Sequence, residues 1–231
     1  SGIMEESDSQ CYWYKRTLKI PETMKGRDIL LHFDAVDWET IVYINGVKVG
    51  RHTGGYDPFY FDITSALKGK EEHELVVYTY DNTGGEGQPK GKQALNKWGC
   101  WYPPVSGIWQ TVWLEPVDPV HIEALMIRPD VDNSCLKVRV NASLTTGVSV
   151  NINLLDKAGD KVAAIAGGKV GRILTLPIEN PHLWSVDDPY LYDLDITIIK
   201  DGVQTDAVSS YCGMRKIEVK KVGETPRVFL N

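Results

Sequence analysis

The sequence has few cysteines, no long apolar run and no basic tract. Its cysteines, Cys11, Cys100, Cys135 and Cys212, are too few and too widely spaced for a disulfide scaffold, and we interpret them as small apolar residues or free thiols. No Cys-x-x-Cys pair and no His/Cys pair with metal-ligand spacing occurs, so we expect neither a metal site nor a cofactor. No apolar run approaches the roughly 20 residues of a membrane span, so we expect no membrane partner.

The charge balance is acidic. Lysine and arginine number 25 and aspartate and glutamate 31 among 231 residues, which gives a formal net charge of −6. This balance argues against nucleic acid as a partner. The first residues, Ser1–Asp8, are polar and acidic and show no signal-peptide pattern. The acidic, tryptophan-rich composition suits a bacterial periplasmic or extracellular protein, and a cytoplasmic one stays open.

Aromatic residues and period-two alternation indicate β-structure. The sequence has seven tryptophans and 11 tyrosines but only four phenylalanines. This bias favours β-strands and partly solvent-exposed surfaces over a helical bundle. Asn45-Gly46 predicts a type I′ hairpin turn, because both central residues of that turn need positive φ. Trp109 and Trp113, four apart in one expected strand, should both face the core. Alternation predicts strands at 13–20, 28–36, 40–44, 47–50, 74–81 and 108–115. An Asp or Thr cap indicates one helical turn at 62–67.

Two prolines bracket a break at Pro116–Pro119, which indicates a stiff linker. Beyond it, short strands are separated by turn residues, a rhythm typical of an immunoglobulin-like β-sandwich. The first segment is larger and carries one long glycine-containing loop, which favours a jelly roll. We therefore predict an all-β chain: a jelly-roll sandwich over 1–117 and an immunoglobulin-like sandwich over 118–219. The expected strands of the second half are 135–141, 148–155 and 190–199, with turns at 158–160, 167–168 and 201–202.

The long loop of the first half is the candidate binding site. Asp81 and Asn82 open it, and Trp101 and Tyr102 lie in a segment stiffened by Pro103 and Pro104. Aromatic rings offer flat faces to the C–H patches of sugars, while the hydroxyls need polar side chains nearby. We take Asp81, Asn82, Trp101 and Tyr102 as candidate carbohydrate-binding residues. For Trp101 and Tyr102, simple packing of the loop is an equal alternative.

No catalytic residue can be assigned from the sequence. A retaining glycosidase needs two carboxylates about 5–5.5 Å apart, but the adjacent acids Glu71-Glu72 and Asp187-Asp188 lie in polar, turn-like stretches and are interpreted as solvated. The serine-hydrolase motif Gly-x-Ser-x-Gly is absent from the sequence. The glycine-rich segment 84–92 lacks the spacing and the following helix of a phosphate loop.

Several motifs, in order along the chain, resemble glycoside hydrolase family 2. Four segments resemble the amino-terminal sugar-binding domain of that family: Tyr14–Pro21, Leu31–Asp37, Val42–Gly46 and Ser106–Glu115. The glycine-containing segment Val49–Phe59 and the segment Phe61–Thr64 fit the same domain. The immunoglobulin-like domain that follows it in the family resembles Asn180–Ser185, Pro189–Tyr192 and Gly213–Ile217.

The resemblance implies a longer protein. The family comprises β-galactosidases, β-glucuronidases and β-mannosidases, whose two catalytic glutamates lie in a separate (β/α)8 barrel, so no residue of this chain inherits either role. Residues 220–231 resemble the start of that barrel domain. Some members carry a sugar-contacting acid shortly before the Ser-Gly-Ile segment, but Trp101–Val105 contains none.

We therefore interpret the chain as the non-catalytic amino-terminal domains of a retaining exo-β-glycosidase. Its expected partners are its own downstream catalytic barrel and a carbohydrate substrate, with assembly into a homo-oligomer left open. Two alternatives stay open: a free-standing carbohydrate-binding module, and a structural or adhesive pair of β-sandwiches. The sugar, its linkage and the parent's metal dependence are not determined by the sequence.

Overall fold

A computed structural model describes residues 10–69, 71–85, 87–96 and 98–231. Ser1–Asp8, whose polar character was noted above, lie outside the described residues. Contacts between Cα atoms divide the chain into two units, Ser1–Val117 and Asp118–Asn231. Almost all regular structure is β-strand, which confirms the predicted all-β class. In the described part of the chain, no helix has the length and apolar character needed to cross a membrane.

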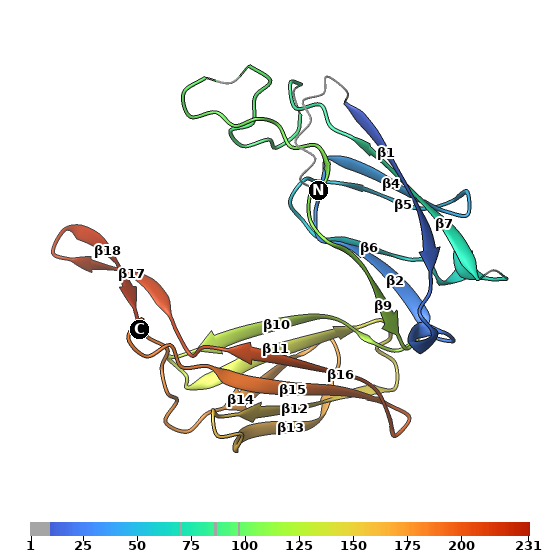
Figure 1. The fold of residues 1–231 in the computed structure, drawn as a ribbon. Helices are drawn as coiled ribbons and strands as arrows, with labels where there is room; N and C mark the ends of the chain where they lie inside the picture. Colours follow the sequence, from blue (N-terminus) through green and yellow to red (C-terminus); the bar gives the residue numbers. More distant parts are fainter. Residues whose placement is uncertain (1–9, 70, 86, 97) are drawn as a thin grey trace. The chain divides into compact units, whose positions relative to one another are not determined.

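The first unit is built from antiparallel sheets (Figure 1). One has four strands, in the order β1 (Cys11–Lys19), β7 (Glu72–Tyr80), β4 (Glu39–Ile44), β5 (Val47–Thr53). The second has three, in the order β6 (Phe59–Asp62), β2 (Asp28–Phe33), β9 (Val112–Val117). The short strands β3 (Val36–Asp37) and β8 (Gly107–Ile108) form a separate pair, and the helices are two short 3₁₀ turns, η1 (Glu22–Met24) and η2 (Thr64–Leu67).

Alternation along the strands decides what is buried. In β4, every second residue faces inward, and β7 repeats the pattern. The strands therefore contribute one apolar face each to a common core, as the period of two requires. The buried hydrophobic residues of this core are Ile29, Leu31, Phe33, Val36, Val42, Ile44, Ile63, Leu75 and Val77.

The predicted hairpin turn is confirmed. Asn45 and Gly46 have φ of 53° and 79°, the signs that a type I′ turn requires. The Asn45 side chain also accepts a hydrogen bond from the Glu74 backbone N–H at 3.1 Å and donates one to the Ala66 carbonyl at 2.9 Å. The turn is thus tied to β7 and to η2 as well as to its own strands.

Two strand predictions were wrong. Residues 28–36 are not one strand, because β2 ends at Phe33 and β3, in another sheet, begins at Val36. Residues 108–115 do not form a single strand, because the chain leaves β8 after Ile108 and enters β9 only at Val112. Trp109 lies in the interruption and donates its indole N–H to the Gly55 carbonyl at 2.8 Å. Trp113 is 41% exposed and stacks on His32, with ring centroids 4.0 Å apart. The two tryptophans therefore do not share a core-facing strand.

The second unit is also antiparallel. A three-stranded sheet runs β10 (Ile122–Asp130), β11 (Cys135–Ala142), β14 (Ile173–Pro177). A four-stranded sheet runs β13 (Lys161–Lys169), β12 (Val148–Leu155), β15 (Tyr192–Lys200), β16 (Val203–Cys212). Seventeen buried residues from the two sheets and their adjoining loops form one cluster, in which Val138, Ile152, Leu194 and Ile196 are fully shielded. A separate hairpin, β17 (Ile217–Val222) and β18 (Thr225–Leu230), completes the unit.

The turn expected at Gly167-Gly168 was also wrong. Both residues lie inside β13, opposite a register shift between Val150 and Ile152 in β12. The N–H of Gly167, with φ of 69°, donates to the Asn151 Oδ1 at 2.9 Å. A side chain at Gly168 would begin 2.7 Å from Leu174. The glycines therefore accommodate a β-bulge and a close approach rather than a reversal of the chain.

None of the four cysteines, all of which lie among the described residues, forms a disulfide. Cys11 and Cys100 are exposed, while Cys135 and Cys212 are buried. Burial raises the pKa of the Cys212 thiol to about 11, so this side chain stays protonated and acts as a small apolar group.

Candidate functional site

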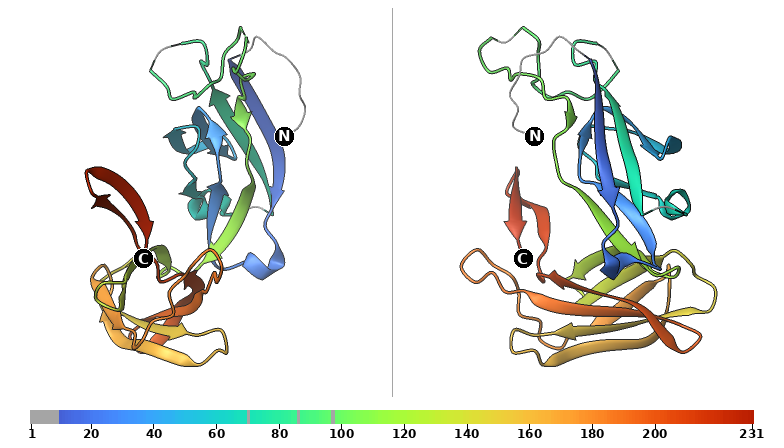
Figure 2. Two further views of the ribbon diagram at one scale, coloured as in Figure 1. Left: turned by 90° about the vertical axis from the view of Figure 1, so that its left-hand side faces the viewer. Right: turned by 45° about the vertical axis from the view of Figure 1, so that its right-hand side comes forward.

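The candidate site is the long connection from the end of β7 to the start of β8. It starts at Asp81 and ends at Ser106, and it lies at one end of the first unit's strands in both views of Figure 2. Its described part contains only turns, bends and one isolated bridge. What shapes this connection is therefore side-chain hydrogen bonding rather than a strand ladder.

Asp81 ties the two ends of the loop together. Its side chain is buried, with 3% exposed, and it accepts hydrogen bonds from Thr83 Oγ1 at 2.8 Å and Gln88 Nε2 at 2.6 Å. A further hydrogen bond comes from Ser106 Oγ, at the far end of the loop. A buried carboxylate with three donors is well compensated for its lost hydration, since hydrogen bonds to a charged acceptor are the strong ones.

Asn82 continues the same scaffold. Its Oδ1 accepts from Gln10 Nε2 at 3.1 Å, and its backbone N–H donates to Gln88 Oε1 at 3.3 Å. Its carbonyl accepts from the Gly85 N–H at 2.9 Å. A Cβ on Gly85 would sit 1.9 Å from the Asn82 amide nitrogen, so a side chain here would displace that of Asn82.

The aromatic side chains of the loop lie at the surface. Trp98 is 77% exposed, Trp101 38% and Tyr102 62%. Their backbone is nonetheless held in place: the Trp101 N–H donates to the Trp98 carbonyl at 3.3 Å, and the Tyr102 N–H donates to the Lys92 carbonyl at 2.9 Å. Tyr102 also forms a parallel bridge with Gln93. The loop thus presents exposed aromatic groups on a constrained backbone.

Gln93 and Asp37 belong to this site, and sequence reasoning missed both. Gln93 Oε1 accepts from the Val105 N–H at 2.5 Å, and its Nε2 lies 3.5 Å from Asp37 Oδ2. Asp37 comes from β3, far from the loop in sequence, and pairs with Gly107 in β8. No local motif marks either residue; only the β3–β8 pairing brings Asp37 under the loop.

Asp37 is electrostatically strained. It is 4% exposed, and its Oδ1 has no hydrogen-bond partner. Burial, together with the nearby charge of Asp81, raises the pKa of Asp37 to about 6, and the hydrogen bond from Gln93 opposes this. A Cβ on Gly55 would lie 2.6 Å from Asp37 Oδ1, so the Gly55 backbone closes over the carboxyl group. The floor of the site therefore holds a carboxyl group poised to change protonation near pH 6.

The four sequence-predicted residues separate into two roles in the structure. The side-chain oxygens of Asp81 accept from residues of the loop and that of Asn82 accepts from Gln10, whereas Trp101 and Tyr102 expose aromatic surface. Exposed aromatic faces can stack on the C–H patches of a sugar ring. Among the described residues, no group of three or more His, Cys, Asp or Glu side chains could hold a metal ion.

Family models match both units. The "Glycosyl hydrolase 2 galactose-binding domain-like" model matches residues 4–110, and the "Glycosyl hydrolases family 2" model matches residues 120–215. Together they match most of the chain. The chain belongs to glycosyl hydrolase family 2, as the motif resemblance predicted.

Curated relatives are much longer than this chain. A β-galactosidase of Thermoanaerobacter pseudethanolicus is 26% identical over 221 residues, which is 92% of this chain and 29% of that protein. A putative β-glucuronidase of Formosa agariphila is 30% identical over 219 residues, 91% of this chain and 26% of that protein. The chain thus spans about a quarter to a third of these relatives.

Solved structures agree on the fold. A β-glucuronidase from Ruminococcus gnavus in complex with D-glucuronic acid superposes with a TM-score of 0.75 at 22% identity. The superposition covers 96% of this chain and 38% of that protein. The chain therefore follows the fold of part of a protein that continues well beyond the matched part.

Proposed function

We propose that the chain forms the non-catalytic domains of a retaining exo-β-glycosidase that hydrolyses terminal β-linked sugars. Residues 1–117 are its sugar-binding-type domain, 118–219 its immunoglobulin-like domain, and 220–231 the start of its catalytic barrel. The observation that carries this proposal is that relatives named β-galactosidase and β-glucuronidase match almost the whole chain, yet only a fraction of their own length. The catalytic carboxylates would then lie in the remaining fraction.

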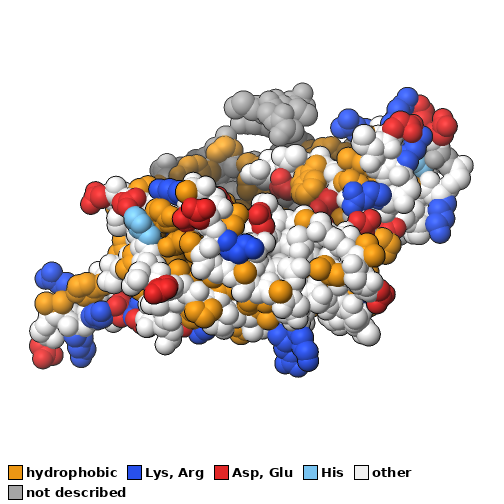
Figure 3. Space-filling view, turned by 90° about the horizontal axis from the view of Figure 1, so that it is seen from below, with side chains coloured by type: hydrophobic (Ala, Val, Ile, Leu, Met, Phe, Trp, Pro, Cys, Tyr) orange, Lys and Arg blue, Asp and Glu red, His pale blue; other side chains and the backbone are white. Residues whose placement is uncertain are grey.

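The β17–β18 hairpin, which contains the proposed boundary between residues 219 and 220, supports packing against the rest of the catalytic domain. The register places Ile217 opposite Leu230 and Val219 opposite Val228, so one face of the hairpin is apolar. Ile217, Val219 and Val228 are 62%, 68% and 72% exposed. At the left edge of Figure 3, where the hairpin lies, hydrophobic side chains stand beside charged ones. A two-stranded hairpin needs a packing partner to be stable, and the catalytic domain would supply it.

The long loop, Asp81–Ser106, is the part of this chain that we propose contacts the sugar substrate. Trp101 and Tyr102 contact the substrate at the rim of the catalytic pocket, while Asp81 and Asn82 hold the loop that presents them. The exposure of both aromatic side chains on a hydrogen-bonded backbone supports this role.

The gene beyond the codon for Asn231 tests the proposal. We expect it to encode a (β/α)8 barrel with two catalytic glutamates, and the 231-residue chain to release no nitrophenol from 4-nitrophenyl β-glycosides. Activity of the chain alone would overturn the assignment. An open reading frame without a barrel, combined with saturable sugar binding by the chain, would instead establish a free-standing binding module.

In the full-length enzyme, Trp101→Ala should lower kcat/KM by about tenfold, the loss of roughly 1.4 kcal/mol of stacking. Trp13→Ala is the matched control, because Trp13 is 65% exposed on the outer face of β1, away from the loop in sequence. Equal losses of kcat/KM for both variants would show that the loop does not contact the substrate.

A further inference from the structure

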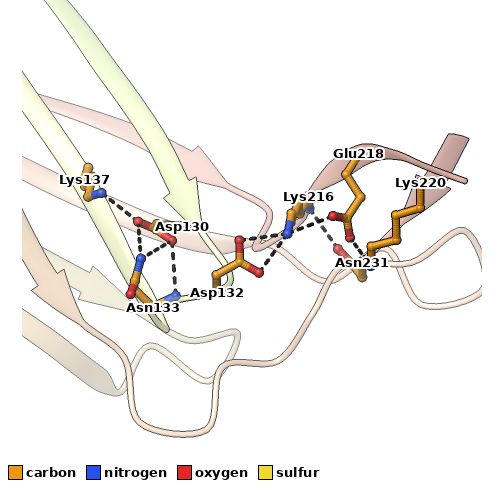
Figure 4. A network of polar contacts seen from close by, with 8 residues as sticks. All are labelled: Asp130, Asp132, Asn133, Lys137, Lys216, Glu218, Lys220 and Asn231. Carbon is orange, nitrogen blue, oxygen red and sulfur yellow. Dashed lines mark hydrogen bonds and ion pairs between the residues drawn. The ribbon is translucent and has the colours of Figure 1, made fainter.

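A hollow of about 390 Å³ opens in the second unit, outside the carbohydrate site. It lies where the turn between β10 and β11 meets the segment that leads into β17 (Figure 4). Polar and charged side chains from both segments converge on it. The residues that line it are Arg128, Pro129, Asp130, Val131, Asp132, Lys137, Arg215, Lys216 and Ile217.

The lysines and the acids of the hollow are already paired. Lys137 Nζ lies 2.7 Å from Asp130 Oδ2, and Lys216 Nζ lies 2.8 Å from Asp132 Oδ2. Lys216 also reaches Glu218 at 3.1 Å, and the Asn133 amide donates to both Asp130 oxygens at 3.0 Å (Figure 4). These carboxylates are thereby neutralised, and they present little net charge to a ligand.

The two arginines of the hollow are different. Neither Arg128 nor Arg215 has an ion pair with a carboxylate in the part of the chain that the structure describes. The Arg215 guanidinium lies 5.3 Å from the centre of the Trp184 ring and is oriented by that stacking. A guanidinium offers a planar fork of donors that matches the two oxygens of a carboxylate or phosphate group.

Arg128 also stands at an unfavourable position within the sheet. The register of β10 and β11 places it directly opposite Lys137, and like charges opposite one another destabilise a sheet. The pKa of Lys137 is raised chiefly by its hydrogen bond with Asp130, while Arg128 acts in the opposite direction. A bound anion would relieve this repulsion.

We propose that the hollow binds a small oxyanion, a carboxylate or phosphate group, through the guanidinium groups of Arg128 and Arg215. The lysine–carboxylate pairs leave the two guanidinium groups as the charges of the hollow without an ion pair, and Pro129 and Val131 contribute apolar surface to its lining. This site is independent of the carbohydrate role proposed for the first unit, because every residue in it belongs to the second.

The test titrates the ¹⁵N-labelled chain at pH 7 with inorganic phosphate in one arm and acetate in the other, with sodium chloride holding ionic strength constant. We expect the Nε–H signals of Arg128 and Arg215 to shift and saturate in at least one arm. Saturation with phosphate alone would assign a doubly charged ligand, and saturation with acetate alone a carboxylate. Absence of saturation in both arms overturns the proposal.

Three variants make the test specific. Arg128→Gln should weaken binding by about tenfold or more, because a charged donor is lost, and Arg128→Lys should restore only part of it, because the fork is lost. Arg139→Gln is the matched control: Arg139 is an exposed arginine of β11 that does not line the hollow, and its loss should change affinity less than about twofold. Equal weakening by Arg128→Gln and Arg139→Gln would show diffuse charge attraction and contradict a site.

Discussion

The two units bury different kinds of side chain. In the described part of the chain, the buried polar or charged residues are Asp37, Thr40, His73, Thr79, Asp81 and Thr83, and all of them belong to the first unit. The second unit packs 17 buried residues into one cluster, against nine in the cluster of the first. The second unit thus has an almost purely apolar interior, while the first shares its interior with polar groups.

The difference shows that apolar packing stabilises the second unit, while buried polar contacts fix the local geometry of the first. Buried polar groups add less net stability than apolar contacts, but each one demands particular partners and so fixes one geometry. Asp81 meets that demand with three donors, whereas Asp37 meets it only in part. We therefore regard the second unit as the scaffold and the first as the unit adapted to hold a loop.

The largest expected effect concerns the scaffold. Ile196→Ala removes a fully buried side chain from the centre of the four-stranded sheet and should lower the free energy of unfolding by about 2–5 kcal/mol. Chemical denaturation followed by circular dichroism measures it. Ile173→Ala, at a position 57% exposed in β14, is the same chemical change without a cavity and should cost far less. Similar losses at both positions would contradict a core-dominated second unit.

A smaller effect is expected at the loop anchor. Asp81→Asn replaces an acceptor oxygen by a donor facing Thr83, Gln88 and Ser106, and should lower the free energy of unfolding by about 1.5–3 kcal/mol. Limited proteolysis should then cut within 82–106 faster than in the parent chain. Asp57→Asn, at an exposed position in the same unit, serves as the control. An unchanged cleavage rate for Asp81→Asn would show that the loop does not depend on this carboxylate.

The smallest effect has the opposite sign and depends on pH. The folded-state pKa of Asp37, about 6, lies above the ordinary value of 3.8, so the folded chain gains stability from protonation below about pH 4 and loses it as pH rises through 6. Asp37→Asn should therefore stabilise the chain by about 1–3 kcal/mol at pH 8 and by almost nothing at pH 4. Thermal unfolding at both pH values measures the difference. A pH-independent effect would show that the pKa of Asp37 is the same in the folded and the unfolded chain, and would contradict the raised folded-state value.

Local patterns predicted the elements with a clear period. The Asn45-Gly46 turn and the strand at 148–155 appear as expected, because turn chemistry and alternation act within a few residues. The break within 108–115 and the bulge at Gly167 were missed, since each depends on a neighbouring strand rather than on the segment itself. Asp81 and Asn82 were found by their place after a strand, whereas Asp37 and Gln93 had no such signal.

The amino-acid sequence by itself determined the all-β class, the family and the order of motifs, because alternation and turn residues are local properties of the chain. Only the tertiary structure decided that Asp81 faces inward to hold its loop, that one carboxylate oxygen of Asp37 lies beneath that loop without a hydrogen-bond partner, and that Arg128 and Arg215 line one hollow. These outcomes depend on strand pairing between distant segments, and on the cost of burying charge, which exists only once the chain has folded.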